Sequence, residues 1–411
     1  MSAARFVLVS FLLAISGWVM PAAADEEPPE PPADYTQIEG LSQAVHQIRR
    51  DVYRVPMDDG ILMYLEVVRP TAEGRFPVIL ELSPYHGTAE DRSGTHILPW
   101  PEVGGEPLGL AGYFAPRGYA VAFADLRGTG RSQGCLDYIG PKDRADAYDI
   151  VEWLGTQPWS SGRVGMAGHS YDAMTQIMTA AAAPPHLETI VPSAGAPRMY
   201  DHEFQDGVPY LGTWSGAIAG YELIAWQRHL PPTPVEIPVF GITGDNFGNE
   251  MQYAGCGATQ NAATTGSSYL TGVEVDWHRQ RDHTAGFVAA DIPVFHVQGA
   301  HDAATRTTTM PGFAARNNPE DKLWFGQWHH GSTDFPYPND RFDQWTGALH
   351  AWFDRHLQLR DVDTGPPVEL FLNDGRVLTA DTWPLPESSP LVLYPSASQT
   401  LTTFPGGDAS A

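Results

Sequence analysis

The chain has 411 residues, and 42% of them are hydrophobic, so it can bury a large core and is not a disordered protein. Its 24 basic and 49 acidic residues give a formal net charge of −25, which argues against nucleic acid as a partner because phosphate binding needs a basic surface. An acidic surface favours solubility, and a high-salt habitat, in which self-repulsion is screened, is an alternative interpretation.

The first residues have the pattern of a secretory signal peptide. Arg5 precedes an apolar run over residues 6–20, and three alanines at 22–24 form a signal-peptidase site of small residues. We expect cleavage near Ala24, which leaves a secreted or periplasmic protein. A membrane anchor is the alternative, but the run is short, and no later segment is apolar enough to cross a bilayer, so no membrane partner is expected. Residues 25–44 are predicted to form an acidic, proline-rich linker.

From residue 45 the predicted elements alternate between strands and helices. Strands at 49–55 and 61–68 flank a turn-forming Pro-Met-Asp-Asp-Gly segment, which predicts a hairpin. The elements that follow are strands at 77–82, 120–124, 164–167 and 187–192 and helices at 108–117, 143–154 and 174–182. Alternation of this kind predicts a parallel sheet covered by helices on both faces.

The alternation stops between residues 197 and 291, where the chain is rich in tyrosine, tryptophan, glycine and proline. We interpret this stretch as a cap inserted over the carboxyl edge of the sheet, where open α/β sheets bind ligands. A packing subdomain without substrate contact is the alternative. Strands at 293–297 and 322–325 and a helix at 341–357 complete a domain that ends near residue 365.

Residues 366–411 have a different character. Short strands are predicted at 368–372 and 390–394, with no helix between them. This pattern predicts the beginning of an all-β domain, but so few strands cannot close a sandwich.

The chain has two cysteines, Cys135 and Cys256. After an export signal an even number of cysteines is consistent with a disulfide, and two unrelated buried thiols are the alternative. The sequence has no Cys/His spacing typical of a zinc site, and we expect no metal and no cofactor.

One serine stands where a buried strand is predicted to turn sharply into a helix. Ser170 lies at this turn, in the run Gly-Met-Ala-Gly-His-Ser-Tyr-Asp-Ala. Such a turn lifts the serine Oγ clear of the sheet and aims the next backbone N–H at a substrate oxygen. A Gly-x-Ser pattern alone is more often an ordinary turn, and here Asp172 occupies the place where the usual pentapeptide has glycine.

A serine nucleophile needs a histidine to accept its proton and a carboxylate to orient that histidine. The strand at 293–297 runs into a loop that ends in Asp302, and His329 and His330 follow the next strand. All of them therefore reach the same edge of the sheet, in the order Ser, Asp, His. The alternative role for Asp302 is to cap a helix that begins near Ala303.

Two further residues compete for these roles. Asp245 also ends an apolar run, but it lies inside the inserted stretch, far upstream of the histidines. His301 neighbours Asp302 and would point away from it along an extended chain. We rank both below the first choices.

With these residues placed, the chain resembles the cocaine-esterase-like and Xaa-Pro dipeptidyl-peptidase-like serine hydrolases of peptidase family S15, which have the α/β-hydrolase fold. The family's elbow reads Gly-x-Ser-Tyr-x-Gly, which Gly168-His169-Ser170-Tyr171 matches. Asp172 then falls at a variable position, and Ala173 replaces the family's second glycine. This replacement should be tolerated if the backbone at Ala173 keeps a negative φ.

Two more segments carry the resemblance, which spans roughly residues 49–372. Residues 125–132, Asp-Leu-Arg-Gly-Thr-Gly-Arg-Ser, resemble the family's Asp-x-Arg-Gly-x-Gly-x-Ser loop. Residues 326–331, Gly-Gln-Trp-His-His-Gly, resemble its Gly-Pro-Trp-x-His-Gly, which selects His330 over His329. Asp302 falls at the family's acid.

The resemblance implies an oxyanion hole and a domain organisation. Ser83-Pro84-Tyr85 resembles the family's Thr/Ser-Pro-Tyr, whose tyrosine hydroxyl acts with the backbone N–H after the nucleophile, here Tyr85 and Tyr171. Packing on the cap is the alternative for Tyr85. Residues 45–365 would be the catalytic domain, and residues 366–411 the start of the family's jelly-roll domain. We expect this last domain to be truncated, because unpaired edge strands favour aggregation.

The prediction is therefore an exported serine hydrolase that cleaves an ester or amide through Ser170, Asp302 and His330 and an acyl-enzyme. A small-molecule ester, an amide or a short peptide is the expected substrate. A non-catalytic binding protein on the same fold is a less favoured alternative.

The sequence leaves the substrate class open between an Xaa-Pro dipeptidyl-peptidase and a carboxylesterase or acylase of the cocaine-esterase type. Residues 190–192 followed by Tyr200-Asp201 resemble the peptidase side. A cap carboxylate, such as Glu203 or Asp206, is a candidate for binding the substrate's amino group.

Overall fold

The computed structural model describes residues 33–85, 109–205, 207–209, 256, 272–302, 305–330 and 342–386, and also residues 388–389, 392, 394–395 and 401–402. The predicted signal peptide, most of the predicted cap, Asp206 and Asp245 lie outside these residues. None of the helices in the described ranges combines the length and the apolar character that a membrane crossing requires.

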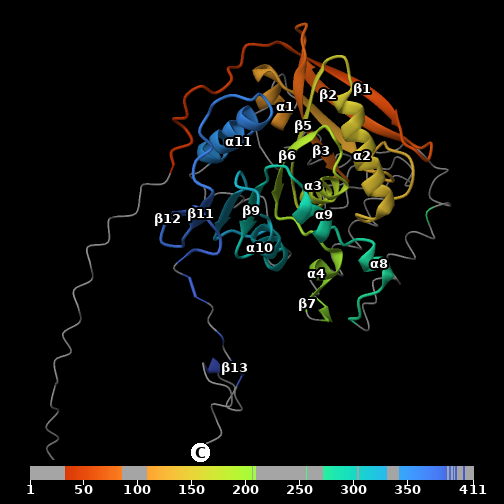
Figure 1. The fold of residues 1–411 in the computed structure, drawn as a ribbon. Helices are drawn as coiled ribbons and strands as arrows, with labels where there is room; N and C mark the ends of the chain where they lie inside the picture. Colours follow the sequence, from red (N-terminus) through yellow and green to blue (C-terminus); the bar gives the residue numbers. More distant parts are fainter. Residues whose placement is uncertain are drawn as a thin grey trace, which may run out of the picture. The chain divides into compact units, whose positions relative to one another are not determined.

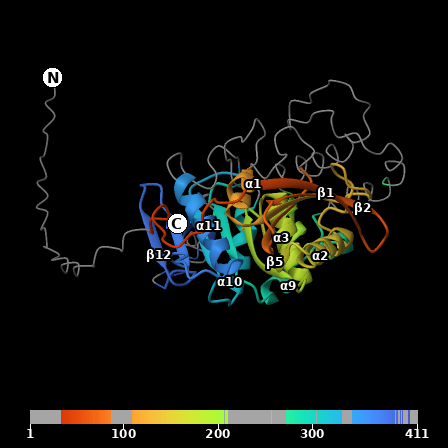
Figure 2. The same cartoon turned by 90° about the horizontal axis from the view of Figure 1, so that it is seen from above.

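A ten-stranded mixed sheet lies at the centre of the fold (Figure 1). Its strands follow the order β1-β2-β4-β3-β5-β6-β9-β10-β11-β12. Neighbours from β4 to β11 in this order run parallel, whereas the β1–β2 hairpin and β12, at opposite ends of the sheet, pair antiparallel (Figure 2). The strands are β1 Ile48–Pro56, β2 Leu62–Pro70, β3 Phe76–Ser83, β4 Ala120–Asp125, β5 Ser160–His169, β6 Leu187–Ser193, β9 Phe295–Gly299, β10 Lys322–Gly326, β11 Val368–Phe371 and β12 Val377–Ala380.

The composition of each strand matches its place in the sheet. Every residue of β3 and β4 is buried, as expected for strands covered on both faces. β1 lies at the edge, and Val55 is its one buried residue. The hairpin and the strands predicted between residues 49 and 325, with their alternation with helices, are therefore confirmed, and they form a mixed α/β sheet.

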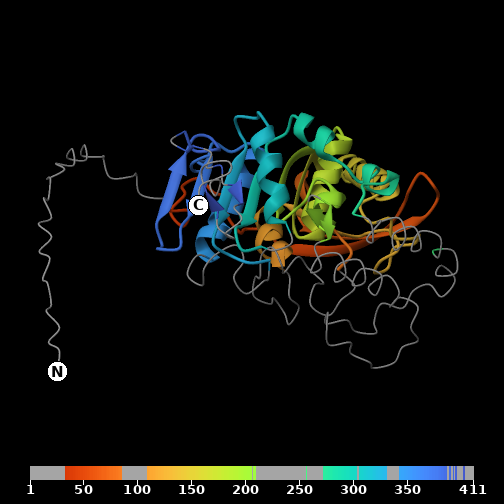
Figure 3. The same cartoon turned by 90° about the horizontal axis from the view of Figure 1, so that it is seen from below.

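Helices cover the two faces of this sheet. On one face α2, α3 and α9 contribute to one apolar core, and on the other α1 and α11 contribute to a second. Figure 3 shows α3 and α10 on the opposite side of the sheet from α1 and α11. The helices are α1 Gly109–Phe114, η1 Ala115–Arg117, α2 Pro141–Gly155, α3 Tyr171–Ala182, α4 Met199–Glu203, α8 Asp276–Arg279, α9 Thr284–Ala289, α10 Arg306–Ala315 and α11 Phe342–His356. Two short strand pairs, β7 Phe204–Gln205 with β8 Val208–Pro209 and β13 Tyr394–Pro395 with β14 Leu401–Thr402, stand apart from the sheet.

The apolar side predicted for the helix near residues 341–357 is confirmed in α11. Trp345, Leu349, Trp352 and Phe353 are each at most 1% exposed. Burial of a large apolar side chain contributes roughly 2–3 kcal/mol. These four side chains therefore fix α11 on its face of the sheet.

The boundary predicted after residue 365 is wrong for the first strand beyond it. β11 pairs in parallel with β10, so Val368–Phe371 extends the central sheet and does not begin a separate β domain. Glu369 explains the register: its buried carboxylate accepts hydrogen bonds from Lys322 Nζ at 2.9 Å and from Trp324 Nε1 at 2.6 Å, both on β10. The jelly-roll domain and its truncation remain predictions, because most residues after 386 lie outside the described part.

The two cysteines are joined by a disulfide bond. The Cα atoms of Cys135 and Cys256 lie 5.4 Å apart, within the usual range for a disulfide. The sequence left open a disulfide or two unrelated thiols, and the structure has the disulfide. The bond ties the loop after β4 to the stretch predicted to form the cap.

Candidate active site

Ser170 lies at a sharp turn between β5 and α3, as predicted. Its backbone has φ +63° and ψ −120°, a conformation that non-glycine residues rarely adopt and that is stable here because the flanking strand and helix are packed. The glycine two residues earlier permits the turn, since a Cβ built on Gly168 would lie 2.5 Å from Asp172 Cβ. The turn therefore directs the Ser170 side chain away from the sheet.

The replacement of the family's second glycine by Ala173 is accommodated. Ala173 lies within α3 and is not among the residues with positive φ, as the sequence prediction required. Its Cβ faces Gly195, where an added Cβ would approach it to 2.9 Å. A glycine on the facing loop thus leaves room for the methyl group that the elbow gains.

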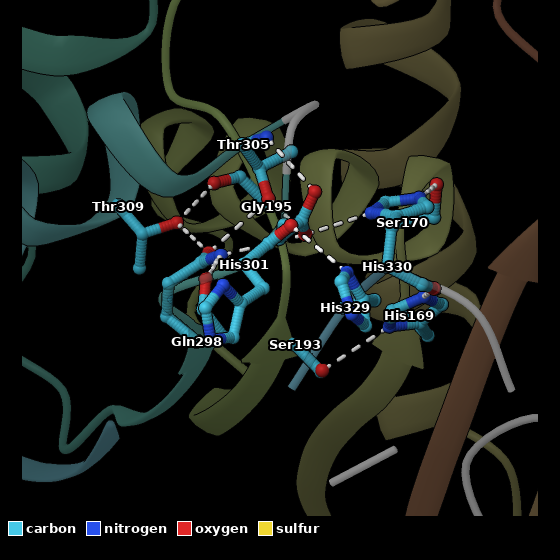
Figure 4. A network of polar contacts seen from close by, with 12 residues as sticks. His169, Ser170, Ser193, Gly195, Gln298, His301, Thr305, Thr309, His329 and His330 are labelled. Atoms are coloured by element: carbon cyan, nitrogen blue, oxygen red, sulfur yellow. Dashed lines mark hydrogen bonds and ion pairs between the residues drawn. The ribbon is translucent and has the colours of Figure 1, made fainter. Parts of the chain in front are cut away.

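The three predicted residues of the triad come together at the carboxyl edge of the sheet. Figure 4 shows Ser170 next to His330. Ser170 Oγ lies 2.7 Å from His330 Nε2, and His330 Nδ1 lies 2.8 Å from Asp302 Oδ2. A neutral imidazole with its proton on Nδ1 satisfies both contacts, because Nδ1 donates to the carboxylate and Nε2 accepts from the hydroxyl. This arrangement can transfer the serine proton to the histidine.

Asp302 is buried and held by side chains that the sequence analysis did not single out. Its Oδ2 accepts a hydrogen bond from Thr305 Oγ1 at 2.7 Å and lies 3.4 Å from Gln298 Nε2. Its Oδ1 accepts from the Thr305 backbone N–H at 3.2 Å, a bond that orders the loop before the next helix. Helix α10 begins at Arg306 with Thr305 as its N-cap, not near Ala303.

The structure separates the two adjacent histidines. His330 faces Ser170, whereas His329 is exposed, and its Nδ1 lies 3.3 Å from the backbone oxygen of His301 (Figure 4). The His301 and His329 rings lie 5.2 Å apart, so His301 lines the loop, as predicted. Asp245, the other competitor, falls outside the described residues.

His169 is a further histidine that the sequence analysis did not assign to the site. Its Nε2 donates to the backbone oxygen of His330 at 2.9 Å, and its Nδ1 accepts from Ser193 Oγ at 3.2 Å. The rings of His169 and His330 lie 4.7 Å apart. His169 therefore fixes the backbone that carries His330. Its position immediately before Ser170 was the one sequence feature that could have indicated a role in the site.

The residues predicted for the oxyanion hole follow two neighbouring strands. Tyr171 is the first residue of α3, where no carbonyl within the helix can accept its N–H. Tyr85 is half-buried two residues after β3, which pairs with β5. Since Leu80 is paired with Met166, the end of β3 lies level with the end of β5, so both tyrosines reach the same edge.

The Asp-Leu-Arg-Gly-Thr-Gly-Arg-Ser segment has a structural role. Arg127, 3% exposed, donates Nε and Nη2 to the two carboxylate oxygens of Asp146, each at 2.6 Å. Burial alone would lower the pKa of the Arg127 guanidinium, but the bonds to Asp146 outweigh burial and raise it. Gly130, with φ +47°, is required because an added Cβ would lie 2.2 Å from Asp125 Oδ2. The motif thus shapes the loop after β4.

Glu203, one of the two candidate carboxylates for binding a substrate's amino group, is buried. Glu203, on α4, is 1% exposed, and its Oε2 lies 3.1 Å from Nε2 of the fully buried His278. Burial raises the pKa of Glu203, and the contact with His278 opposes this shift. Asp206 lies outside the described residues. Among the described residues, no group of three or more His, Cys, Asp or Glu side chains could hold a metal ion.

The sequence matches a known family model. Residues 59–332 match the model for X-Pro dipeptidyl-peptidases of the S15 family. The chain belongs to the S15 family. A Streptomyces avermitilis relative, assigned by its name to the Xaa-Pro dipeptidyl-peptidases, is 27% identical over 93% of this chain. The cocaine esterase of Rhodococcus sp. is 26% identical over 86% of this chain.

Solved structures show the same fold. A CocE/NonD family hydrolase from Staphylococcus aureus has a TM-score of 0.64 and 21% sequence identity over 89% of this chain and 65% of its own. This S15 chain thus has a mixed α/β sheet fold similar to that of the CocE/NonD hydrolases. It spans 56% of the Streptomyces relative and 63% of the cocaine esterase, so it corresponds to little more than half of their length.

Proposed function

We propose that this S15 chain is a serine hydrolase in which Ser170 is the nucleophile, His330 the general base and Asp302 the residue that orients the base. The observation that carries the proposal is the continuous line of contacts from Ser170 Oγ to His330 Nε2, at 2.7 Å, and from His330 Nδ1 to Asp302 Oδ2, at 2.8 Å. The family membership and the strained turn at Ser170 support it independently.

The proposed reaction proceeds by acyl transfer. As Ser170 Oγ forms a bond to the substrate carbonyl carbon, its proton passes to His330 Nε2 and the carbonyl electron pair moves to oxygen. The Tyr171 N–H and the Tyr85 hydroxyl stabilise this oxyanion. The intermediate then expels an alcohol or amine, which takes the proton from Nε2. Water repeats the sequence on the acyl-enzyme and releases a carboxylic acid.

The substrate is proposed to be an ester or amide, with dipeptidyl-peptidase and esterase or acylase activity as the two candidates. The family description supports a peptidase, and the cocaine esterase among the relatives supports an esterase. Burial of Glu203 against His278 favours the esterase side, since a buried, paired carboxylate is poorly placed to bind a substrate's amino group.

We also propose that the protein is exported, with cleavage near Ala24. The signal-peptide pattern of residues 1–24 and the disulfide between Cys135 and Cys256 support this, since disulfides persist in oxidising compartments. Amino-terminal sequencing of protein recovered from outside the cytoplasm should begin at or near Asp25. Recovery of uncleaved protein in the cytoplasm alone would contradict export.

Substrate assays test the assignment of roles. Wild type should hydrolyse p-nitrophenyl butyrate or Ala-Pro p-nitroanilide, and preference between the two gives the substrate class. His330→Ala should reduce kcat by about 10⁴-fold or more, as removal of a triad member does elsewhere, while His329→Ala serves as the matched control and keeps most of the activity. The opposite ranking would overturn the assignment of the base. No turnover of any ester or amide by folded wild type would favour a non-catalytic binding protein.

A further inference from the structure

A pocket of about 580 Å³ opens at the edge of the sheet opposite to the candidate active site. Its lining includes Phe76 and Pro77 at the beginning of β3 and residues 161 and 163 near the beginning of β5, whereas Ser170 follows the end of β5. β5 has ten residues, so the two ends of this strand lie roughly 30 Å apart. The volume falls within the range of about 300–1,000 Å³ that is usual for small-molecule sites.

The lining of this pocket is basic in a strongly acidic protein. It includes Arg75, Arg117, Arg163 and Arg360, four of the 24 basic residues in a chain of net charge −25. No aspartate or glutamate is among the described residues that line it. Four cations gathered in one concave site focus a positive potential there.

Part of this charge is not neutralised by neighbouring carboxylates. Two of the arginines have such a neighbour: Arg163 with Glu188 at 3.0 Å and Arg360 with Asp354 at 3.7 Å. Arg75 and Arg117 have no ion-pair partner among the described residues, and Arg75 is exposed. These two charges have no carboxylate beside them in the described part of the chain, although Arg117 Nη1 already donates to the Tyr113 backbone oxygen at 2.7 Å. The planar guanidinium group matches the oxygens of a carboxylate or phosphate.

The rim of the pocket adds apolar surface. Val45 and Leu359 belong to the lining and are 74% and 66% exposed. Leu359 also has φ +58°, a left-handed conformation that is unfavourable for a non-glycine residue and that usually carries glycine after a helix. Neither packing nor backbone preference explains a leucine here, whereas contact with the apolar part of a ligand would.

We propose that this pocket binds a small organic oxyanion, a phosphate monoester or a carboxylate that carries an apolar chain. The anionic group is held by the arginines, with Arg75 and Arg117 supplying the uncompensated charge. The chain of the ligand lies against Val45 and Leu359. The site lies away from Ser170, so the proposal does not depend on the proposed hydrolase activity.

Isothermal titration calorimetry of the full chain with hexyl phosphate, hexanoate and inorganic phosphate tests the proposal. Hexyl phosphate or hexanoate should bind at least tenfold more tightly than inorganic phosphate, since a buried CH₂ group contributes about 0.8 kcal/mol. Arg75→Gln should weaken binding of every probe at least fivefold. Its matched control is Arg376→Gln, which removes one charge at a 65% exposed side chain outside the pocket and should change nothing. Both are surface replacements that keep the fold.

Leu359→Gly separates the apolar contact from the ionic one. It should weaken hexyl phosphate but not inorganic phosphate, while the relief of backbone strain keeps the protein folded. Flotation with vesicles that contain phosphatidic acid, whose headgroup is a phosphate monoester, distinguishes a lipid headgroup from a free ligand: Arg75-dependent flotation would identify the lipid surface as the source of the anion. The proposal is overturned if wild type binds none of the probes or vesicles, if Arg75→Gln and Arg376→Gln behave alike, or if the alkyl chain adds no affinity.

Discussion

The buried histidine at the end of α11 should make the protein less stable in mild acid. His356 is 7% exposed, and burial, followed by the nearby charges of Arg355 and Arg163, lowers the pKa of His356 from 6.5 to about 4. A histidine with a depressed pKa in the folded state stabilises the protein above its unfolded pKa. This stability is lost as the pH falls from about 6.5 towards 4, because the unfolded chain takes up a proton that the folded chain does not.

The size of the effect follows from the two pKa values. With about 6.5 in the unfolded and about 4 in the folded chain, the loss between about pH 7 and pH 5 is about 2 kcal/mol. His356→Phe removes this titration and keeps a ring next to Trp352, whose centroid lies 4.2 Å from that of His356. The free energy of unfolding, measured by urea denaturation, should therefore fall about 2 kcal/mol less in His356→Phe than in wild type over this range.

The control for this comparison is His301→Phe, at an exposed histidine. It makes the same replacement outside the buried core, and its loss of stability in acid should match that of wild type. The comparison of variants is needed because other groups act in the opposite direction: burial, opposed by Arg127, raises the pKa of Asp146 to about 6, so its contribution to stability falls as the pH rises. An equal acid-induced loss in wild type and His356→Phe would refute the reasoning.

Three further tests address side-chain contacts in the fold. Thr305→Val removes the 2.7 Å hydrogen bond to Asp302 Oδ2 and should lower kcat about tenfold with little change in KM, whereas Thr305→Ser should retain kcat; equal values in both variants would exclude this role. Gly195→Ala should lower the free energy of unfolding in urea by about 1–3 kcal/mol, because the new methyl group crowds Ala173. Adding Ala173→Gly should restore part of this loss, and purely additive effects of the two substitutions would disprove the contact. Arg127→Ala leaves a buried carboxylate unpaired and should cost about 3–5 kcal/mol, and a loss below about 1 kcal/mol would show that the ion pair is dispensable.

The residues of the candidate triad could be found from the sequence because each follows an apolar strand. A buried parallel strand forms a recognisable apolar run, and the residue after it must lie at the carboxyl edge of the sheet. Ser170, Asp302 and His330 all satisfy this rule. The choice between His329 and His330 needed the family pattern, and in the structure His330 faces Ser170 whereas His329 contacts the backbone of His301.

The parts that the sequence did not reveal depend on contacts between distant residues. β11 was assigned to a separate domain because it follows a proline-rich segment and has no helix after it. Its place in the sheet depends on a buried pair between Glu369 and Lys322, 47 residues apart, which no local pattern indicates. Thr305 and His169 were missed for a related reason. Their hydrogen bonds to Asp302 and to the backbone of His330 form only when the chain folds, and no local sequence pattern indicates them.

The central claim is that Ser170 is a nucleophile activated by His330. Labelling with a fluorophosphonate probe, followed by intact mass and peptide mapping, tests it directly, because the probe reacts with an activated serine whatever the natural substrate. The account predicts one adduct per chain, located on Ser170, that is absent in Ser170→Ala and strongly reduced in His330→Ala. Folded wild type that remains unlabelled, or that carries the adduct on another residue, would contradict it.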